Sequence, residues 1–215
     1  NEGLHGILIS VNPFVLEQVP FERTMRAIKI SEEIFDGNVI VYQDFFRHQF
    51  EEFNIKGTVS FMKYFQMAGP RSLSYIELLP MGRTCYKLGF LYGKYPAKMF
   101  FGESCKEELT RPWHVHIDNY GNYVSGYCGG ISLGDAEDMN SLRCINLEEK
   151  PILKALATDI KSLYDIGVKE FNYQENNEGY ISKCHLCIDI RKHIVQKTGK
   201  FRELNPTEFY QQLSA

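Results

Sequence analysis

The sequence predicts a mixed α/β protein that consists of a parallel strand–helix region followed by a smaller α+β region. Up to Pro80, short apolar runs rich in β-branched residues alternate with amphipathic segments, which is typical of strand–helix–strand units with a parallel sheet. After Gly102 the pattern changes to two alternating segments around a turn, followed by helical segments. We therefore predict two domains, 1–101 and 102–215.

Five elements are predicted in the first domain. They are a strand at 6–11, a helix from Pro20 to Gly37, a strand at Val39–Tyr42, a helix around Val59–Met67 and a strand at Tyr75–Leu79. The first run, Gly-Ile-Leu-Ile-Ser-Val, is apolar at nearly every position, so it suits a strand buried on both faces. Because neighbouring parallel strands are joined by right-handed crossovers, these elements predict a parallel sheet of three strands.

The first predicted strand has no earlier helix to cover it and no earlier strand to pair with it. An open edge of a parallel sheet invites pairing with other chains. We therefore expect the edge of Ile7–Val11 to be covered by a missing N-terminal half, by a partner chain or by another copy of this chain.

The second domain is predicted to contain a β-hairpin. Trp113, Val115 and Ile117 alternate with polar residues, Gly121 suits the positive φ of a turn, and Tyr123–Ser125 is the returning strand. Three helices are expected after it, at Pro151–Asp165 with Gly167 as the cap, at Ile188–Thr198, and after Asn205, with Asn205 as N-cap and Pro206 in the first turn.

Four of the six cysteines occur in an arrangement that suits metal binding. Cys184 and Cys187 form a Cys-x-x-Cys pair before a predicted helix, and two thiolates at this spacing can reach one metal. Cys105 and Cys128 flank the predicted hairpin, whose two ends meet in space. Four thiolates can hold either a zinc ion or an iron–sulfur cluster.

Other interpretations of these residues remain open. The four cysteines could be unrelated buried side chains, and Cys-x-x-Cys alone is also the spacing of a redox dithiol. Cys85 and Cys144 have no partner at ligand spacing, so we interpret both as structural residues outside the site. His114 and His116 share one face of the hairpin, either as a metal-binding pair or as part of a polar strand face.

The composition excludes several classes of function. The formal net charge is −3, which provides no electrostatic basis for binding nucleic acid. No apolar run approaches the roughly 18 residues that a membrane span needs, and residues 1–5 do not resemble a secretory signal. We therefore expect a cytoplasmic protein whose partners include neither nucleic acid nor membrane.

Three segments near the cysteines form a recognisable pattern. They are His-Ile-Asp-Asn-Tyr-Gly-Asn at 116–122, Gly-Tyr-Cys at 126–128 and Ile-Ser-Leu-Gly-Asp at 131–135. This pattern resembles the SPASM and twitch extensions of radical S-adenosylmethionine enzymes, which bind auxiliary iron–sulfur clusters. The first domain resembles the second half of that family's partial parallel (βα) barrel, at 8–13, 39–43 and 79–83.

The resemblance implies one auxiliary 4Fe-4S cluster held by Cys105, Cys128, Cys184 and Cys187. Since no cysteine follows Cys187, a second auxiliary cluster cannot be built, and the extension is better described as twitch-like. The resemblance also implies that groups near the carboxyl ends of the barrel strands contact S-adenosylmethionine. These groups are Ser10, Asn12, Gln43, Gly82 and Arg83.

One departure from the family matters for function. The Cys-x3-Cys-x2-Cys motif that holds the family's catalytic cluster is absent from this sequence. We therefore expect the C-terminal portion of a radical enzyme, inactive alone, whose substrate in the complete enzyme is a peptide or a small molecule. The alternative is a non-enzymatic interaction module stabilised by a closed four-cysteine zinc site.

Overall fold

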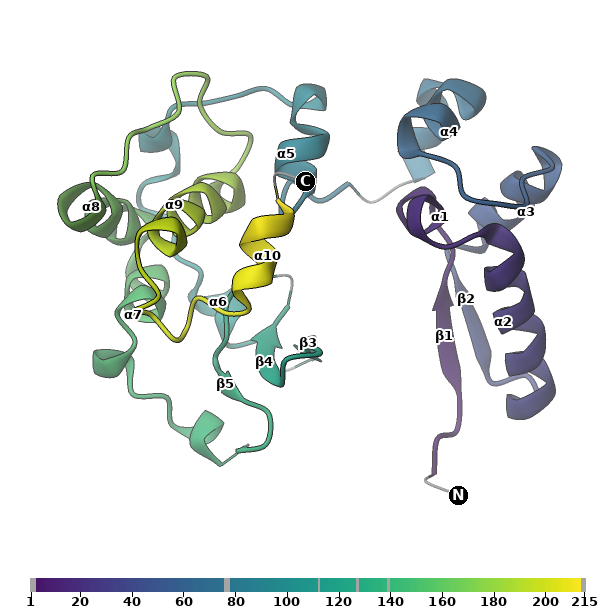
Figure 1. The fold of residues 1–215 in the computed structure, drawn as a ribbon, viewed down its shortest axis with the longest axis horizontal. Helices are drawn as coiled ribbons and strands as arrows, with labels where there is room; N and C mark the ends of the chain where they lie inside the picture. The colour runs from purple at the N-terminus through teal and green to yellow at the C-terminus, as the bar shows by residue number, and fades with distance from the viewer. Residues whose placement is uncertain (1–2, 76–77, 112, 127, 139, 214–215) are drawn as a thin grey trace. The chain divides into compact units, whose positions relative to one another are not determined.

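A computed structural model describes residues 3–75, 78–111, 113–126, 128–138 and 140–213 (Figure 1). The chain divides into two units, residues 1–78 and 79–215, and each is described by itself. The boundary lies earlier than the expected 101–102, because the segment that starts at Leu79 packs with the second unit. In that segment Ala97 is fully buried in the core of the second unit, and the backbone of Tyr95 pairs with that of Tyr180.

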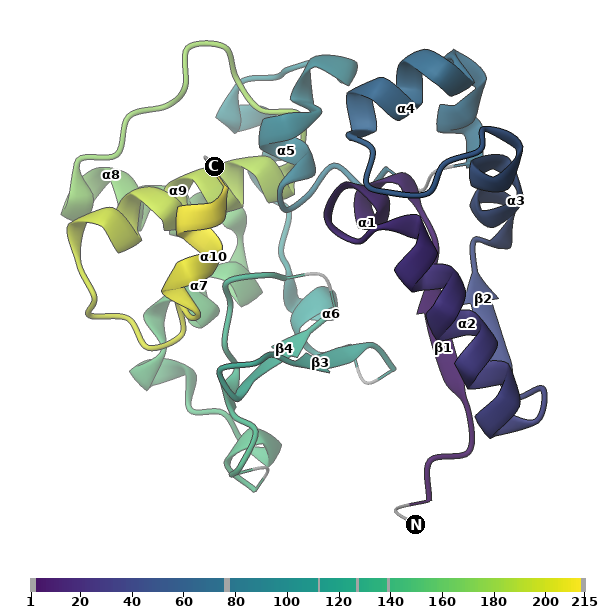
Figure 2. The same cartoon turned by 45° about the vertical axis from the view of Figure 1, so that its right-hand side comes forward.

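The first unit contains the predicted strand–helix–strand arrangement. β1 (Ile7–Ser10) and β2 (Val39–Tyr42) form a parallel pair, and α2 (Phe21–Phe35) connects them. This helix packs along one face of the pair (Figure 2). The mixed α/β class and the parallel pairing of these two strands are therefore confirmed.

The other face of this sheet is exposed. Leu8 and Ile40 lie opposite each other in the strand register, and they are 53% and 61% exposed. The expectation of a first strand buried on both faces is therefore wrong for the described residues, because the one helix that packs on the pair covers only one of its faces.

Three further helices complete the first unit. α1 (Pro13–Gln18) and α3 (Asp44–Glu52) are additional to the sequence prediction, whereas α4 (Phe61–Ala68) matches the helix expected around 59–67. α1 begins directly after β1 because the side chain of Asn12 accepts hydrogen bonds from two backbone N–H groups of its first turn. Aromatic side chains form most of the core of this unit, namely Phe21, Phe46, Phe50, Phe61 and Tyr64.

The strand expected at Tyr75–Leu79 is not formed by the described residues. Pro70–Tyr75 is a 3-10 helix, Leu78 and Leu79 lie outside any strand, and residues 76 and 77 fall outside the described part. Local hydrogen bonds favour this turn structure, since both the backbone N–H and the hydroxyl of Ser72 donate to the carbonyl of Gly69. The described sheet thus has two parallel strands instead of the three of the expected half-barrel.

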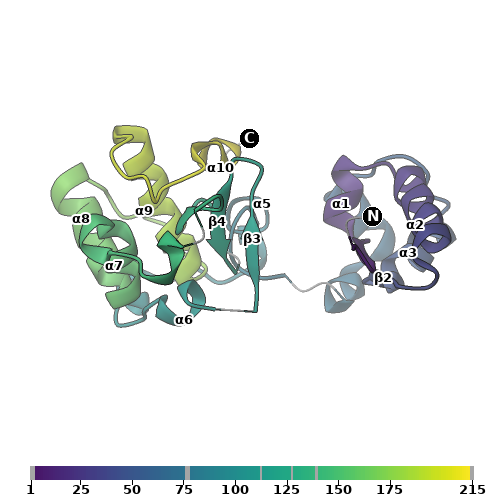
Figure 3. The ribbon, with the colours of Figure 1, turned by 90° about the horizontal axis from the view of Figure 1, so that it is seen from below.

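The second unit has a helical core. α7 (Pro151–Thr158), α8 (Ile160–Phe171) and α9 (Lys183–Lys197) lie side by side (Figure 3), and α10 (Thr207–Gln212) packs against α9. The side chains at the centre of this core are almost completely buried, namely Ile152, Leu153, Ile160, Leu163, Leu186, Ile190 and Ile194. α9 includes the expected helix and starts five residues earlier, so both residues of the Cys-x-x-Cys pair lie inside it.

Two of the predicted helix boundaries are wrong. The helix expected at 151–165 is interrupted at Asp159, whose carboxylate accepts hydrogen bonds from the backbone N–H groups of Lys161 and Gly102 and so caps α8. Gly167 lies within α8 and does not end it, since Asn172 is the C-cap. A Cβ atom on Gly167 would lie 2.8 Å from Ile190, so this glycine allows α8 and α9 to approach closely.

The expected cap of the last helix is also wrong. α10 begins at Thr207, after Pro206, while the side chain of Asn205 donates a hydrogen bond to the backbone oxygen of Arg202. The amide of Asn205 is therefore held by the preceding loop and is not the N-cap.

The predicted hairpin is confirmed. β3 (Val115–Ile117), β4 (Asn122–Ser125) and β5 (Gly134–Asp135) form an antiparallel sheet in that order. The remaining short helices of the second unit are α5 (Thr84–Lys87), α6 (Lys106–Leu109) and 3-10 turns at Gly89–Leu91, Ala97–Phe100, Ser141–Arg143 and Leu147–Glu149. Within the described part of the chain, no helix combines the length and apolar character that a membrane span requires.

Candidate metal centre

The four cysteines at ligand spacing come from three segments of the second unit. Cys105 directly precedes α6, and its backbone N–H donates to the carbonyl of Leu156, which ties it to α7. Cys128 follows β4, in the loop that leads to β5. Cys184 and Cys187 lie in the first two turns of α9, which starts after Ser182 because the Ser182 hydroxyl accepts a hydrogen bond from the His185 N–H.

These segments bring the four thiols into one region. Burial raises the pKa of the Cys184 thiol to about 12, and the nearby Cys187 and Cys128 raise it further. Burial likewise raises the pKa of Cys128 to about 11, and it raises the pKa of Cys105 strongly, in both cases with an additional contribution from Cys187. Each of these thiols thus lies close enough to Cys187 to feel its charge.

A buried arginine lies against this group of thiols. Arg191 is 3% exposed, and its Nε lies 3.2 Å from the Sγ of Cys187, one helical turn earlier. Its Nη1 donates to the backbone oxygen of Gly129 at 3.0 Å and to the hydroxyl of Tyr210 at 2.7 Å. Within the described part of the chain, Arg191 forms no ion pair with a carboxylate.

The groups that face Arg191 are instead sulfurs and a tyrosine hydroxyl. Burial alone would lower the pKa of the guanidinium, but Cys187, Tyr210 and Cys128 together raise it. Arg191 also lowers the pKa of the thiols of Cys128 and Cys184, although burial outweighs this effect. In the metal-free protein the buried thiols are therefore held in their neutral form, and Arg191 offsets only part of the cost of ionising Cys128 and Cys184.

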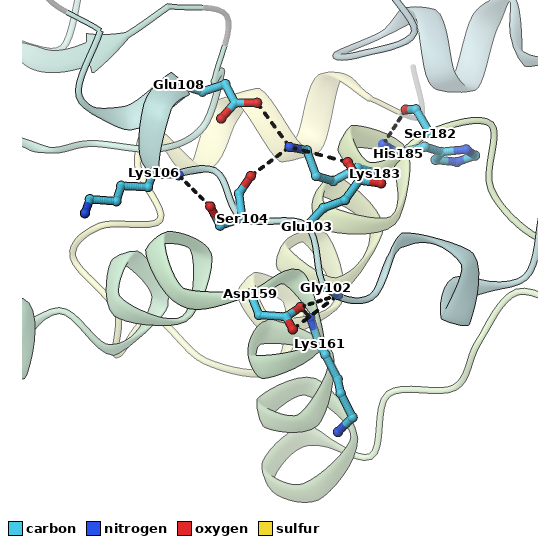
Figure 4. Close-up of polar contacts among 10 residues, drawn as sticks. All are labelled: Gly102, Glu103, Ser104, Lys106, Glu108, Asp159, Lys161, Ser182, Lys183 and His185. Atoms are coloured by element: carbon cyan, nitrogen blue, oxygen red, sulfur yellow. Dashed lines mark hydrogen bonds and ion pairs between the residues drawn. The ribbon is translucent and has the colours of Figure 1, made fainter.

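A second cation lies on the other side of Cys184 in the sequence (Figure 4). The Nζ of Lys183 lies 2.9 Å from the backbone oxygen of Ser104 and 3.1 Å from Oε1 of Glu108, and it is 3.8 Å from Glu103. Burial would lower the pKa of Lys183, but Cys105 and Glu108 raise it overall. Lys183 thus joins the start of α9 to the segment around Cys105.

The thiols are not arranged as a closed site for a single ion. Among the residues that the structure describes, no three histidine, cysteine, aspartate or glutamate side chains could hold a metal ion. A zinc ion with four cysteines places each sulfur about 2.3 Å from the metal, so the sulfurs lie within about 4 Å of each other. The donor set itself, four thiols beside two cations, suits a metal centre whose four thiolate ligands give the complex a net negative charge.

Cys85, predicted to be a structural residue outside the site, interacts electrostatically with Cys184 and Cys187. It is 4% exposed, and burial raises the pKa of its thiol to about 12, with further increases from Cys184 and Cys187. The spacing of Cys85 from Cys184 and Cys187 in the sequence does not predict this interaction. Cys144 is exposed.

Two further residues near the cysteines, Arg191 and Lys183, were not predicted from the sequence. Arg191 follows Cys187 by four residues, a spacing that places both on one helix face and could have indicated their contact. Lys183 adjoins Cys184, but its contact with Glu108 depends on tertiary packing. Neither residue type is common in a protein core without a partner.

The histidines do not complete the site. His185 is 6% exposed, its Nδ1 accepts a hydrogen bond from the backbone N–H of Ile181, and burial lowers its pKa. His185 is therefore buried and held by the backbone at the start of α9. On the hairpin, the Nε2 atoms of His114 and His116 lie 2.9 Å apart, so these side chains do share a face.

The residues expected near S-adenosylmethionine divide between the two units. Ser10, Asn12 and Gln43 lie together at the carboxyl end of the β1–β2 pair. Asn12 caps α1, and Gln43 has a φ of 63° where β2 turns into α3. Gly82 and Arg83 lie in the second unit, directly before α5.

A polar cavity of about 720 Å³ lies elsewhere in the second unit. Its lining includes Tyr120, Asp135, Lys150 and Arg202, and none of the expected site residues. Comparisons of the chain with protein families, with curated proteins and with solved structures find no match.

Proposed function

We propose that this chain binds one auxiliary 4Fe-4S cluster through Cys105, Cys128, Cys184 and Cys187, as the C-terminal portion of a radical S-adenosylmethionine enzyme. The observation that carries the proposal is the buried guanidinium of Arg191, which contacts the thiol of Cys187 and forms no ion pair with a carboxylate in the described part of the chain.

Burying the charge of Arg191 carries a free-energy cost. Removing an ionic group from water costs several kcal/mol unless an opposite charge and hydrogen bonds compensate for it. A neutral thiol is only a weak acceptor, so it compensates little. A metal centre with four cysteine thiolates carries net negative charge and would supply the missing anion beside Arg191.

A single zinc ion and a 4Fe-4S cluster differ in the spacing of the thiols that they need. A zinc ion draws its four sulfurs into one tight tetrahedron. In a 4Fe-4S cluster each thiolate binds a different iron, so the sulfurs lie further apart around a larger centre. The resemblance to the SPASM and twitch extensions favours the cluster.

Several residues would assist the bound state. Thiolates at the start of α9 are favoured by the helix dipole, and Cys184 and Cys187 lie there. Arg191 and Lys183 add positive charge on two sides. When bound, a cluster with four thiolate ligands would supply a one-electron redox site, since each iron already has a cysteine ligand.

The first unit supports the remaining part of the proposal only by its topology. Its β1–α2–β2 arrangement is a parallel unit of the kind that a partial (βα) barrel repeats. In such a barrel, Ser10, Asn12 and Gln43 would face S-adenosylmethionine, together with Gly82 and Arg83. The Cys-x3-Cys-x2-Cys motif would come from an N-terminal half or partner chain, and the substrate would be a peptide or small molecule.

Metal analysis of protein purified without oxygen tests the proposal. After reconstitution with iron and sulfide, we expect about four of each per chain. Replacing Cys187→Ala should remove the cluster, whereas the matched control Cys144→Ala, at an exposed cysteine, should keep it. Zinc alone in the purified protein, with no iron uptake, would overturn the proposal in favour of a zinc-stabilised interaction module.

A further inference from the structure

We propose that the polar cavity of the second unit binds a small zwitterion of the amino-acid class, a molecule that carries both an ammonium and a carboxylate group. The carboxylate of Glu203 receives the ammonium group of the ligand, and the ammonium group of Lys150 receives its carboxylate. The cavity has a volume of about 720 Å³, which is within the usual range for small-molecule sites. Because no cysteine lines it, this site does not depend on the proposed cluster.

Three hydrogen bonds hold the walls of the cavity together. The backbone N–H of Ser132 donates to the backbone oxygen of Glu203 at 2.9 Å, which joins the loop before β5 to the segment between α9 and α10. The Nζ of Lys150 donates to the backbone oxygen of Leu133 at 2.5 Å. The backbone N–H of Ile152, in the first turn of α7, donates to Oε1 of Glu203 at 3.0 Å. Both charged groups are therefore fixed in position before a ligand arrives.

The carboxylate of Glu203 is buried with only part of its hydrogen-bonding capacity used. The residue is 3% exposed and lines the cavity, and among the described residues it belongs to no ion pair and its Oε2 accepts no hydrogen bond. No fully enclosed side-chain oxygen lacks a partner in that part of the chain, so Oε2 has access to the cavity. Glutamate is rarely buried without a partner, and the single N–H of Ile152 offsets only part of the cost of desolvating its charge.

Capping of α7 does not by itself explain a glutamate at this position. A neutral side chain with one oxygen can accept the hydrogen bond from the Ile152 N–H equally well. The negative charge and the second oxygen of Glu203 remain without a partner in the protein, so they favour a cationic donor in the cavity.

The ammonium group of Lys150 provides the opposite charge in the same cavity. Lys150 is half-buried, and its hydrogen bond to Leu133 uses only one of its three donors. Among the residues that the structure describes, Lys150 forms no ion pair, and therefore none with Glu203. The two charges thus face one cavity without contacting each other, which leaves room for a ligand between them.

A ligand with both charges satisfies both groups. A simple anion would be repelled by Glu203, and a simple cation would be repelled by Lys150. Phe201, which is buried, also lines the cavity and offers apolar contact to the carbon atoms that separate the two charges of the ligand. The remaining charged lining residues are exposed and balance in sign, so they discriminate less between ligands: Asp135, Glu149, Lys200 and Arg202.

The test is isothermal titration of the full chain with glycine, β-alanine and 4-aminobutyrate, in which the spacing between the two charges increases in steps. We expect saturable binding at one site for at least one of them. The N-acetyl and amide derivatives of that ligand, which each lack one charge, should bind about 10- to 100-fold more weakly, the usual effect of losing a hydrogen bond between charged groups.

Two variants test the protein side of the same contacts. Glu203→Gln removes the charge but keeps an oxygen for the Ile152 N–H, and Lys150→Met keeps a long side chain. Each should weaken binding by about 10- to 100-fold. N-acetylation of the ligand should weaken its binding to Glu203→Gln little further, because the partner of the ammonium group is already absent. Glu170→Gln and Lys197→Met, at exposed residues outside the cavity, are the matched controls.

The outcomes are decisive for the ligand class. Absence of binding by all three zwitterions overturns the proposal, as does tighter binding of inorganic phosphate or glucose than of any zwitterion. Binding that neither Glu203→Gln nor Lys150→Met weakens also overturns it. Circular dichroism shows whether the variants fold, and the ligand derivatives tested on wild type decide the outcome if a variant does not.

Discussion

The substitution Arg191→Met distinguishes the effect of the charge beside the cysteine centre from the effect of side-chain packing. Methionine keeps a long flexible side chain but removes the cation and its hydrogen bonds to Cys187, Gly129 and Tyr210. The effect should depend on whether the centre is occupied, because the guanidinium has an anionic partner only when the thiols are ionised.

The magnitude follows from the burial of the guanidinium, which is 3% exposed. Without metal, losing the bonds to Gly129 and Tyr210 costs about 1.5 to 3 kcal/mol each. Removing a buried charge that lacks a carboxylate partner restores several kcal/mol of folding free energy. The two effects oppose each other, so the free energy of unfolding of the metal-free protein should change by only about 1 kcal/mol. With the cluster bound, removing one partner of a buried charge pair costs about 3 to 5 kcal/mol.

The assay compares urea unfolding of the metal-free and cluster-bound proteins under anaerobic conditions. We expect the stabilisation by the cluster to fall by about 3 to 5 kcal/mol, roughly two to three and a half powers of ten in affinity. The reduction potential should also become more negative, because a nearby positive charge favours the reduced cluster. Arg191→Lys, which keeps the charge, should show a smaller loss, and Arg202→Met is the control at an exposed arginine.

Equal destabilisation of the metal-free and cluster-bound forms by Arg191→Met would refute this reasoning. It would show that Arg191 acts through packing and hydrogen bonds alone, and the case for an anionic centre would lose its main support.

Three further predictions concern stability. Because burial raises the pKa of Cys128 to about 11 and of Cys184 to about 12, from an ordinary value of 9.0, the unfolded chain binds fewer protons than the folded chain above pH 9. The metal-free protein should therefore lose stability as pH rises from 9 to 12. The cluster-bound form, whose thiols are already ionised, should show no such loss. Chemical denaturation of both forms at several pH values measures the difference. Metal removal should increase hydrogen exchange in β3 and β4 first and leave β1 and β2 unchanged, because ligand binding supplies folding free energy to the region that holds the metal; equal protection throughout would contradict a structural role of the centre. Asp159→Ala should lower the free energy of unfolding, measured in urea, by about 1 to 2 kcal/mol, because it removes the cap of α8. The control Asp165→Ala removes only surface ion pairs, so it should lower the free energy of unfolding by less than about 1 kcal/mol. Similar losses for the two aspartate variants would argue against the cap.

Elements with a strong local pattern could be predicted from the sequence. The apolar run of β1, the amphipathic stripe of α2 and the turn chemistry of the hairpin each depend on residues close together in the chain, so local periodicity was sufficient to find them. The break between α7 and α8 was missed because the apolar stripe continues across it, from Leu156 to Ile160. Only the hydrogen bonds of Asp159 show that the helix stops there.

Short elements next to strands were harder to predict. α1 begins immediately after β1, and α3 begins immediately after β2, where Gln43 takes a left-handed conformation. α1 has only six residues, too few turns for a 3.6-residue period to be visible, whereas α3, with nine, is longer than the predicted α4. Their stability comes instead from aromatic packing, as Phe46 and Phe50 show by being almost completely buried.

The sequence by itself determined which cysteines are candidates for a metal centre, because the Cys184–Cys187 spacing and the hairpin between Cys105 and Cys128 are local features. The spacing of Arg191 from Cys187 also indicates their contact, but only the tertiary structure decided that the Cys85 thiol interacts with those of the Cys-x-x-Cys pair and that the guanidinium of Arg191 is buried. Both depend on packing between segments far apart in the chain: α5 against the start of α9, and α9 against Gly129 and Tyr210. Burial and electrostatic environment arise from such contacts, and no periodicity or spacing within a single segment encodes them.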